Sequence, residues 1–231
     1  MYADGRIAVI DYRTGLEGRT AVFIGGIDVT SSFGLSPQTV RGAAVSDSDS
    51  DLGVLLTATA SMPGRYYQVG DNRPALLYDA NQSGIDNIYF AEARSLLVPS
   101  FDGLKIPVHL YIPNGTSIIN KRPAIFLIHG GPQEHLDPLY DSIIQFLANR
   151  GYAVLQMNFR GSTGYGKEFW QASFKKWGLE MQDDITDGTQ WLIDKGIADP
   201  ERIAIYGGSY GGYATLMGLV KEPDLYAAGV D

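Results

Sequence analysis

The length, composition and charge of the chain are those of a globular protein and exclude several functional classes. Its 231 residues are 45% hydrophobic and 19% charged, which is enough apolar material for one large domain or two smaller ones. A formal net charge of −8 argues against non-specific binding to nucleic acid, which needs clustered Lys and Arg. The absence of cysteine excludes disulfides, thiol catalysis and cysteine-bound metals. No apolar run approaches the length of about 18 residues that a membrane span needs.

Residues 1–94 have the pattern of an all-β segment. Short apolar runs are separated by turn signals such as Pro63-Gly64, and no helical period of useful length occurs. The predicted strands lie at 6–12, 20–24, 53–58 and 75–79. This spacing suits a sandwich or propeller blades. A propeller of this size would not close, so that interpretation predicts that the chain begins partway through one.

From residue 95 onward, predicted strands alternate with predicted helices. The strands lie at 107–112, 124–129, 152–157 and 202–206, and one helix lies near 181–195. Asp137-Pro138 has the N-cap and first-turn proline that open a helix, and Gly151 is placed to end it. Buried strands linked by helices predict a largely parallel sheet with helices on both faces, so we expect an α/β domain over residues 95–231.

The sequence His129–Pro132 follows the predicted strand at 124–129 and contains two adjacent glycines. In α/β-hydrolases a glycine-containing loop at this place supplies one backbone N–H to the oxyanion hole. We therefore predict that the N–H of Gly131 is an oxyanion donor. The alternative is a simple turn that ends a strand.

Residues 161–167 nearly match the phosphate-binding pattern Gly-x-x-x-x-Gly-Lys-Ser/Thr, which makes a nucleotide-hydrolysing P-loop protein the rival prediction. Glu168 stands where that pattern requires the hydroxyl that binds Mg²⁺, and its carboxylate would repel phosphate. We expect instead a loop beside the active site, with Arg160 and Tyr165 as substrate contacts. A structural turn with Arg160 in an internal salt bridge remains open.

The stretch 206–214, Tyr-Gly-Gly-Ser-Tyr-Gly-Gly-Tyr-Ala, is the most specific motif in the chain. A strand, a Gly-x-Ser-x-Gly turn and a helix in succession describe a nucleophile elbow, which predicts that Ser209 is the nucleophile. The N–H of Tyr210 opens the helix and is the second predicted oxyanion donor. We expect the four glycines at 207, 208, 211 and 212 to be needed because strand and helix nearly touch. The alternative is an ordinary turn in a chain with 28 glycines.

The histidines leave the predicted triad incomplete. His109, His129 and His135 all precede Ser209, whereas this fold orders its triad as Ser, then Asp or Glu, then His. Triads are defined by geometry, so His129 could act as base by convergence, although the oxyanion loop already explains its position. We therefore expect the triad Asp and His to lie beyond Asp231, in a longer protein.

Residues 95–231 resemble the N-terminal part of the catalytic domain of the prolyl oligopeptidase family of serine peptidases, especially its acylaminoacyl-peptidase and dipeptidyl-peptidase branch. The matching segments follow in order at 100–107, 129–132, 158–166, 181–184, 199–203 and 206–214. The resemblance implies a β-propeller ahead of the hydrolase domain and a small-peptide substrate.

Together these observations predict the end of a β-propeller followed by part of an α/β-hydrolase domain, in a cytoplasmic serine peptidase without metal or organic cofactor. Ser209 would form the acyl-enzyme, and the N–H groups of Gly131 and Tyr210 would hold the oxyanion. The alternatives are an esterase or lipase on the same fold and a non-catalytic remnant of it. We expect residues 1–231 by themselves to be inactive.

Overall fold

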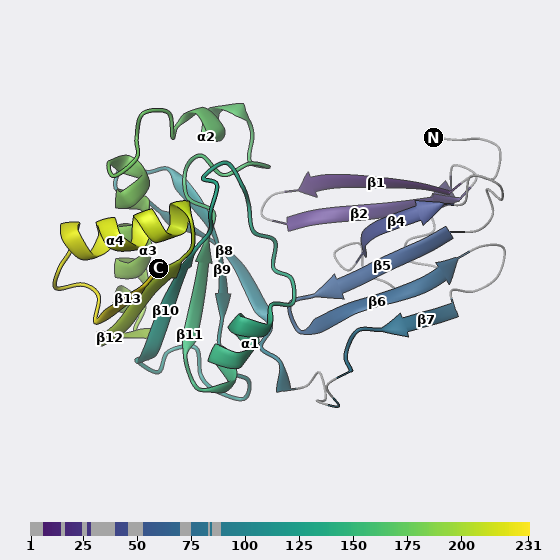
Figure 1. The fold of residues 1–231 in the computed structure, drawn as a ribbon, viewed down its shortest axis with the longest axis horizontal. Helices are drawn as coiled ribbons and strands as arrows, with labels where there is room; N and C mark the ends of the chain where they lie inside the picture. The colour runs from purple at the N-terminus through teal and green to yellow at the C-terminus, as the bar shows by residue number, and fades with distance from the viewer. Residues whose placement is uncertain are drawn as a thin grey trace. The chain divides into compact units, whose positions relative to one another are not determined.

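The computed structural model describes residues 7–14, 17–24, 27–28, 40–45, 53–69, 75–82, 84 and 89–231. The chain separates into two compact units, Met1–Asn87 with Leu139–Asp141, and Ile88–Pro138 with Ser142–Asp231 (Figure 1). Each unit has its own sheets. No helix among the described residues is long and apolar enough to cross a membrane.

The described part of the first unit is built from antiparallel strands in two sheets. One sheet contains β1 (Ile7–Thr14), β2 (Glu17–Ile24) and β3 (Ile27–Asp28), and the other contains β4 (Val40–Val45), β5 (Gly53–Thr59), β6 (Met62–Val69) and β7 (Ala75–Asp79). The second sheet is a four-stranded meander, which is the form of a propeller blade. The sequence analysis did not predict β3, β4 or β6.

The predicted turn at Pro63-Gly64 was wrong, because both residues lie inside β6. The turn is formed by Ala60 and Ser61, and the pairing of β5 with β6 is irregular between Thr57 and Thr59. A proline is tolerated near such an irregularity, since the ladder there does not need its missing N–H.

The second unit is built around a six-stranded sheet in the order β13-β12-β10-β11-β9-β8. These strands are β8 (Ala93–Pro99), β9 (Lys105–Tyr111), β10 (Arg122–Ile128), β11 (Ala153–Met157), β12 (Ala198–Gly207) and β13 (Ala228–Val230). β10 is parallel to both β11 and β12, and β12 is parallel to β13, whereas β9 is antiparallel to β8 and β11. The carboxyl ends of β10, β11 and β12 therefore meet at one edge of the sheet, where sites of α/β proteins form.

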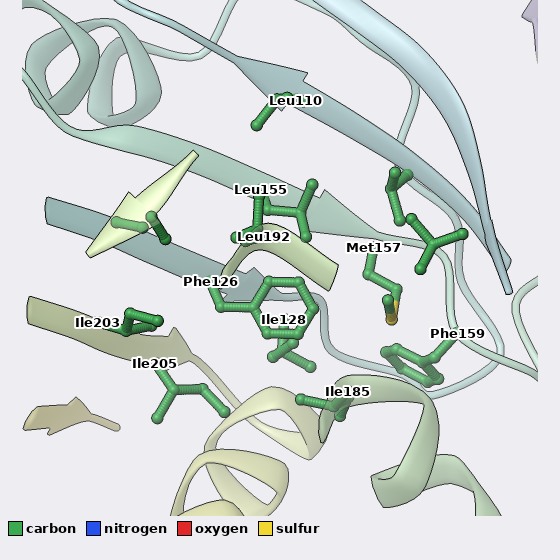
Figure 2. Packing of buried hydrophobic residues seen from close by; sticks show 14 of the residues in the cluster. Leu110, Phe126, Ile128, Leu155, Met157, Phe159, Ile185, Leu192, Ile203 and Ile205 are labelled. Atoms are coloured by element: carbon green, nitrogen blue, oxygen red, sulfur yellow. The ribbon is translucent and has the colours of Figure 1, made fainter. Parts of the chain in front are cut away.

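Four helices accompany this sheet: α1 (Ser142–Asn149), α2 (Lys167–Gln171), α3 (Glu180–Asp194) and α4 (Tyr210–Lys221). Alternate residues of β10 and β12 face α3 across a core that includes Phe126, Ile128, Ile205 and Ile185 (Figure 2). Each such side chain contributes about 1.5–3 kcal/mol through its burial. All five residues of β11 are buried, as in a strand covered on both faces, and α1 lies beside it (Figure 1).

The helix predicted to open at Asp137-Pro138 begins instead at Ser142. Leu136 donates its N–H to the side chain of Asn158, and Asp137 lies 3.5 Å from the ring of His135. The bond from Leu136 to Asn158 fixes the chain directly before the predicted start of the helix. Pro138 also disfavours the helical conformation for the residue before it.

Candidate active site

The turn between β12 and α4 places Ser209 in a strained backbone conformation. β12 ends at Gly207 and α4 begins at Tyr210, so strand, turn and helix follow one another directly, as the sequence predicted. Ser209 has φ 59° and ψ −120°. For a non-glycine residue, a backbone in such a sparsely populated region costs about 1–3 kcal/mol. The serine is exposed to solvent at the edge of the sheet.

Two of the four glycines around Ser209 are required by close approach of the backbone. A Cβ on Gly207 would lie 2.7 Å from the carbonyl oxygen of Ile128, and a Cβ on Gly211 would lie closer still to the same atom. A Cβ on Gly212 would meet the side chain of Asp231. The expectation for Gly208 was wrong, because a Cβ there would find nothing within 4 Å.

The loop after β10 lies directly beside Ser209. Ile128, the last residue of β10, pairs with Gly207, so the two loops leave the sheet as neighbours. A Cβ on Gly130 would lie 3.5 Å from Cβ of Ser209 and 3.9 Å from its Oγ. This places the segment with Gly131 next to the hydroxyl group.

The two predicted oxyanion donors have N–H groups that are not used in the fold. In the part of the chain that the structure describes, the N–H of Gly131 has no hydrogen-bond acceptor. The N–H of Tyr210 is the first of α4 and has no partner within the helix. Gly131 has φ 109°, a conformation that other residues rarely adopt, and a Cβ there would lie 2.7 Å from the backbone nitrogen of Gln133.

The ring of His129 is bonded to this loop and to Ser162, and neither of its nitrogens is bonded to Ser209. Its Nδ1 lies 2.7 Å from the carbonyl oxygen of Gly130, and its Nε2 lies 2.9 Å from Oγ of Ser162. Its ring stacks on Phe159, with centroids 4.3 Å apart. Burial lowers the pKa of His129 below its usual value, although the Gly130 carbonyl and the charge of Glu134 act in the opposite direction. The ring is therefore a neutral structural group near pH 7.

The other two histidines are also engaged away from Ser209. His109 lies on β9 between Oγ of Ser95 and the carbonyl of Leu136, each 3.0 Å away. His135 contacts Oγ1 of Thr163 at 3.1 Å and Asp137 at 3.5 Å. No hydrogen bond joins any histidine of the chain to Ser209, and all three histidines lie in the described part.

Arg160 forms the internal salt bridge that the sequence had left open. Its Nε and Nη2 donate to the two oxygens of the fully buried Asp184 at 2.9 and 2.7 Å, and its Nη1 donates to Asp102 at 2.9 Å. Although burial opposes it, hydrogen bonds to the two carboxylates raise the pKa of Arg160. The bond from Arg160 lowers the pKa of Asp102. The guanidinium thereby ties the segment after β11 to α3 and to the turn between β8 and β9.

Tyr165 lies in the same segment. Its hydroxyl group accepts a hydrogen bond from Nδ2 of Asn158 at 2.9 Å, and its ring lies 5.4 Å from that of Phe169.

The side chain of Tyr210 points away from Ser209 into an aromatic cluster. Its ring lies 5.4 Å from Phe159 and 4.9 Å from Trp177, and its hydroxyl group contacts Sδ of Met181. Burial raises the pKa of the Tyr210 hydroxyl, with smaller contributions from the neighbouring Tyr213 and Asp184. The ring of Tyr210 thus anchors the start of α4.

Sequence analysis missed the supporting role of Asn158, Phe159 and Ser162. The available signal was their position directly after the buried strand β11, at the sheet edge that also carries the loops after β10 and β12.

Comparison with protein families agrees with this arrangement. The profile of the prolyl oligopeptidase family matches residues 138–231. Residues 138–231 are therefore similar to the prolyl oligopeptidase family. Ser209, Tyr210 and Arg160 lie inside the family segment, as does the near match to a P-loop at 161–167, whereas Gly131 precedes it.

Similar proteins include dipeptidyl aminopeptidase BIII of Pseudoxanthomonas mexicana, which is 51% identical over 109 residues. That match covers 47% of this chain and 16% of the relative. Acylamino-acid-releasing enzyme 1 of Oryza sativa subsp. japonica is 32% identical over 127 residues, which are 55% of this chain and 16% of the relative. The chain therefore matches about one sixth of the length of these relatives.

Solved structures of prolyl oligopeptidase type confirm the predicted combination of propeller strands and α/β-hydrolase fold. A puromycin-hydrolysing peptidase of Mycobacterium tuberculosis superposes with a TM-score of 0.80 at 22% identity, covering 100% of this chain and 36% of that one. An acylaminoacyl peptidase of Pyrococcus horikoshii superposes with a TM-score of 0.73 at 26% identity, covering 96% of this chain and 34% of that one.

Proposed function

We propose that this chain is the nucleophile-bearing part of a serine-type peptidase that cleaves oligopeptides. Oγ of Ser209 attacks the carbonyl carbon of the scissile bond, and the tetrahedral oxyanion accepts hydrogen bonds from the N–H groups of Gly131 and Tyr210. A general base takes the proton from Oγ and passes it to the leaving nitrogen, so that collapse of the intermediate releases the amine and leaves an acyl group on Ser209, which water then removes. A single oxyanion donor is worth about 10²–10³ in kcat.

The observation that carries this proposal is the contact between the loop after β10 and the nucleophile. The place of a Cβ on Gly130 lies 3.5 Å from Cβ of Ser209, Gly131 is the next residue of that loop, and Tyr210 directly follows Ser209. An exposed hydroxyl on a strained turn, beside two N–H groups that the fold does not use, is the arrangement that acyl transfer needs.

None of the three histidines of the chain is proposed as the general base of the reaction. His129, His135 and His109 are each held by other partners, and neither ring nitrogen of His129 is directed at Ser209. A serine hydroxyl without a base is a weak nucleophile near neutral pH. We therefore do not propose His129 as the general base, although the sequence had left that role open to it.

The names of the relatives support peptides as substrates. They are dipeptidyl and acylamino-acid-releasing enzymes, and one structural neighbour hydrolyses puromycin. We propose a short peptide substrate on this ground. The cytoplasmic location stays a prediction, which cell fractionation would test.

Labelling with a fluorophosphonate tests the nucleophile directly, because the reagent requires an activated serine beside an oxyanion hole. We expect the intact protein to be labelled and Ser209→Ala to be neither labelled nor active. Ser142→Ala is the control, since Ser142 is an exposed serine at the start of α1. Labelling that survives in Ser209→Ala would place the nucleophile elsewhere.

Substrate class is tested by comparing peptide anilides with short-chain esters on the same preparation. We expect release of the anilide at a rate that Ser209→Ala abolishes. Turnover of esters alone would favour the esterase alternative, which shares the elbow and the oxyanion loop.

A further inference from the structure

The main chain of Leu136, in the loop between β10 and α1, is held by buried side chains at both of its polar groups. Its N–H donates to Oδ1 of Asn158 at 2.7 Å, and its carbonyl accepts from Nδ2 of Asn158 at 2.9 Å. Nε2 of His109 lies 3.0 Å from the same carbonyl oxygen. Asn158 and His109 are both 0% exposed. Both backbone polar groups of Leu136 are therefore hydrogen-bonded, as they are in a residue within a sheet.

The orientation of the Asn158 amide follows from its surroundings. A flipped amide would face the N–H of Leu136 with a second donor and its carbonyl with a second acceptor. The remaining hydrogen of Nδ2 is directed at the hydroxyl group of Tyr165, 2.9 Å away, and the backbone N–H of Asn158 donates to Pro107 at 2.9 Å. The Asn158 side chain therefore cannot rotate without losing its hydrogen bonds to Leu136 and Tyr165.

Two further contacts attach the same loop to the segment 158–163. The N–H of Thr163 donates to the carbonyl of Glu134 at 2.9 Å, and Oγ of Ser162 lies 2.9 Å from Nε2 of His129. The attachment points are therefore His129 on one side of Gly131 and the pair Glu134 and Leu136 on the other. The segment 158–163 is itself anchored to α3, because its Arg160 donates hydrogen bonds to Asp184 of that helix.

We infer that Asn158 is a positioning residue for the oxyanion loop: by clamping Leu136, its amide keeps the N–H of Gly131 aimed at the reacting carbonyl. This inference rests on the proposed function, in which Gly131 is an oxyanion donor. Such donors work because they are fixed before the reaction, and a displacement of about 1 Å can cost about 10² in rate. Asn158 is fully buried, is bonded through its side chain to Leu136 and Tyr165, and acts through the loop.

The chain offers a matched control in Gln145 of α1. Its amide makes the same two-way clamp, accepting from the N–H of Ala91 at 2.6 Å and donating to the carbonyl of Ala91 at 2.9 Å. Gln145 is also buried, with 4% exposed. Asn158→Ala and Gln145→Ala each remove a buried amide and two backbone bonds, but only the first releases the oxyanion loop.

The test compares kcat, KM and the fluorophosphonate labelling rate of the two variants in the intact protein. We expect Asn158→Ala to lower kcat and the labelling rate by about 10- to 100-fold with KM changed by less than about threefold. Gln145→Ala should stay within about twofold in kcat even where its melting temperature falls equally. Unchanged kcat in Asn158→Ala, or an equal loss in both variants, would overturn the inference.

Amide hydrogen exchange separates failure of the inference from failure of the proposed function. We expect faster exchange over residues 130–136 in Asn158→Ala and not in Gln145→Ala, whatever the activity. If Ser209 in the unsubstituted protein is not labelled, the proposed function fails, and unchanged exchange over 130–136 would then refute the positioning role by itself.

Discussion

Gly211, in the first turn of α4, packs against the carbonyl oxygen of Ile128 at the end of β10, and a Cβ on Gly211 would overlap that oxygen. The contact joins the elbow helix to the strand that leads into the oxyanion loop. The spacing between the turn at Ser209 and the loop after β10 therefore depends on this backbone approach.

Gly211→Ala should destabilise the protein by about 1–3 kcal/mol, because the backbone of α4 or β10 must shift to admit the methyl group. Gly208→Ala is the control, since a Cβ there enters open space and its cost should be within about 0.5 kcal/mol. Urea unfolding of both variants measures the difference. Equal losses would show that the approach of Gly211 to Ile128 is not what requires glycine.

Gly131→Ala should lower kcat by about 10²–10³, because the left-handed backbone and the contact with Gln133 force the N–H to reorient. Gly151→Ala carries a similar backbone strain, with φ 93° and nothing near its Cβ, outside the site. The variant Gly151→Ala should lower the free energy of unfolding by about 1 kcal/mol and leave kcat unchanged. Hydrolysis of peptide anilides measures kcat for both variants. An equal loss of kcat in Gly131→Ala and Gly151→Ala would favour a purely structural turn at Gly131.

Arg160→Met should cost about 3–5 kcal/mol, because it leaves the buried carboxylate of Asp184 without its counter-ion. Arg202→Met breaks an exposed pair with Asp199 and should cost at most about 1 kcal/mol. Thermal unfolding distinguishes them. A stable Arg160→Met variant with a raised KM would instead assign Arg160 to the substrate, as the other sequence hypothesis had it.

Acid should weaken the protein through His129. Its pKa is lowered in the folded state by burial, so below about pH 6.5 the unfolded chain binds a proton that the folded chain resists. The free energy of unfolding should therefore fall as the pH drops from 7.5 toward 5. His129→Gln should show a shallower dependence on pH than the parent, whereas His135→Gln leaves the His129 contribution in place. Identical slopes in all three proteins would contradict the assignment.

Local pattern was sufficient for the elements that bury a regular stripe or run of side chains. The strands β9 to β12 were predicted from apolar runs, because burial in a sheet requires them, and the helix α3 was predicted from the acidic residues Asp183 and Asp184 in its first turn and from Gly196 at its end. The elbow at Ser209 was predictable because a tight strand-to-helix turn needs glycine at defined positions. β6 was missed because Pro63-Gly64 is a turn signal taken alone, and the ladder with β5 overrides it.

What the sequence determined by itself was therefore the alternation of strands and helices after residue 95 and the strand-turn-helix around Ser209, since both depend on neighbours a few residues apart. Only the tertiary structure decided which glycines lie against the backbone of Ile128, that Arg160 is held by Asp184, and that Asn158 binds the main chain of Leu136. These outcomes join residues that are 22 or more positions apart, as Asn158 and Leu136 are. Such pairs leave no local pattern, because their hydrogen bonds and close approaches exist only once the sheet has brought its strand ends together.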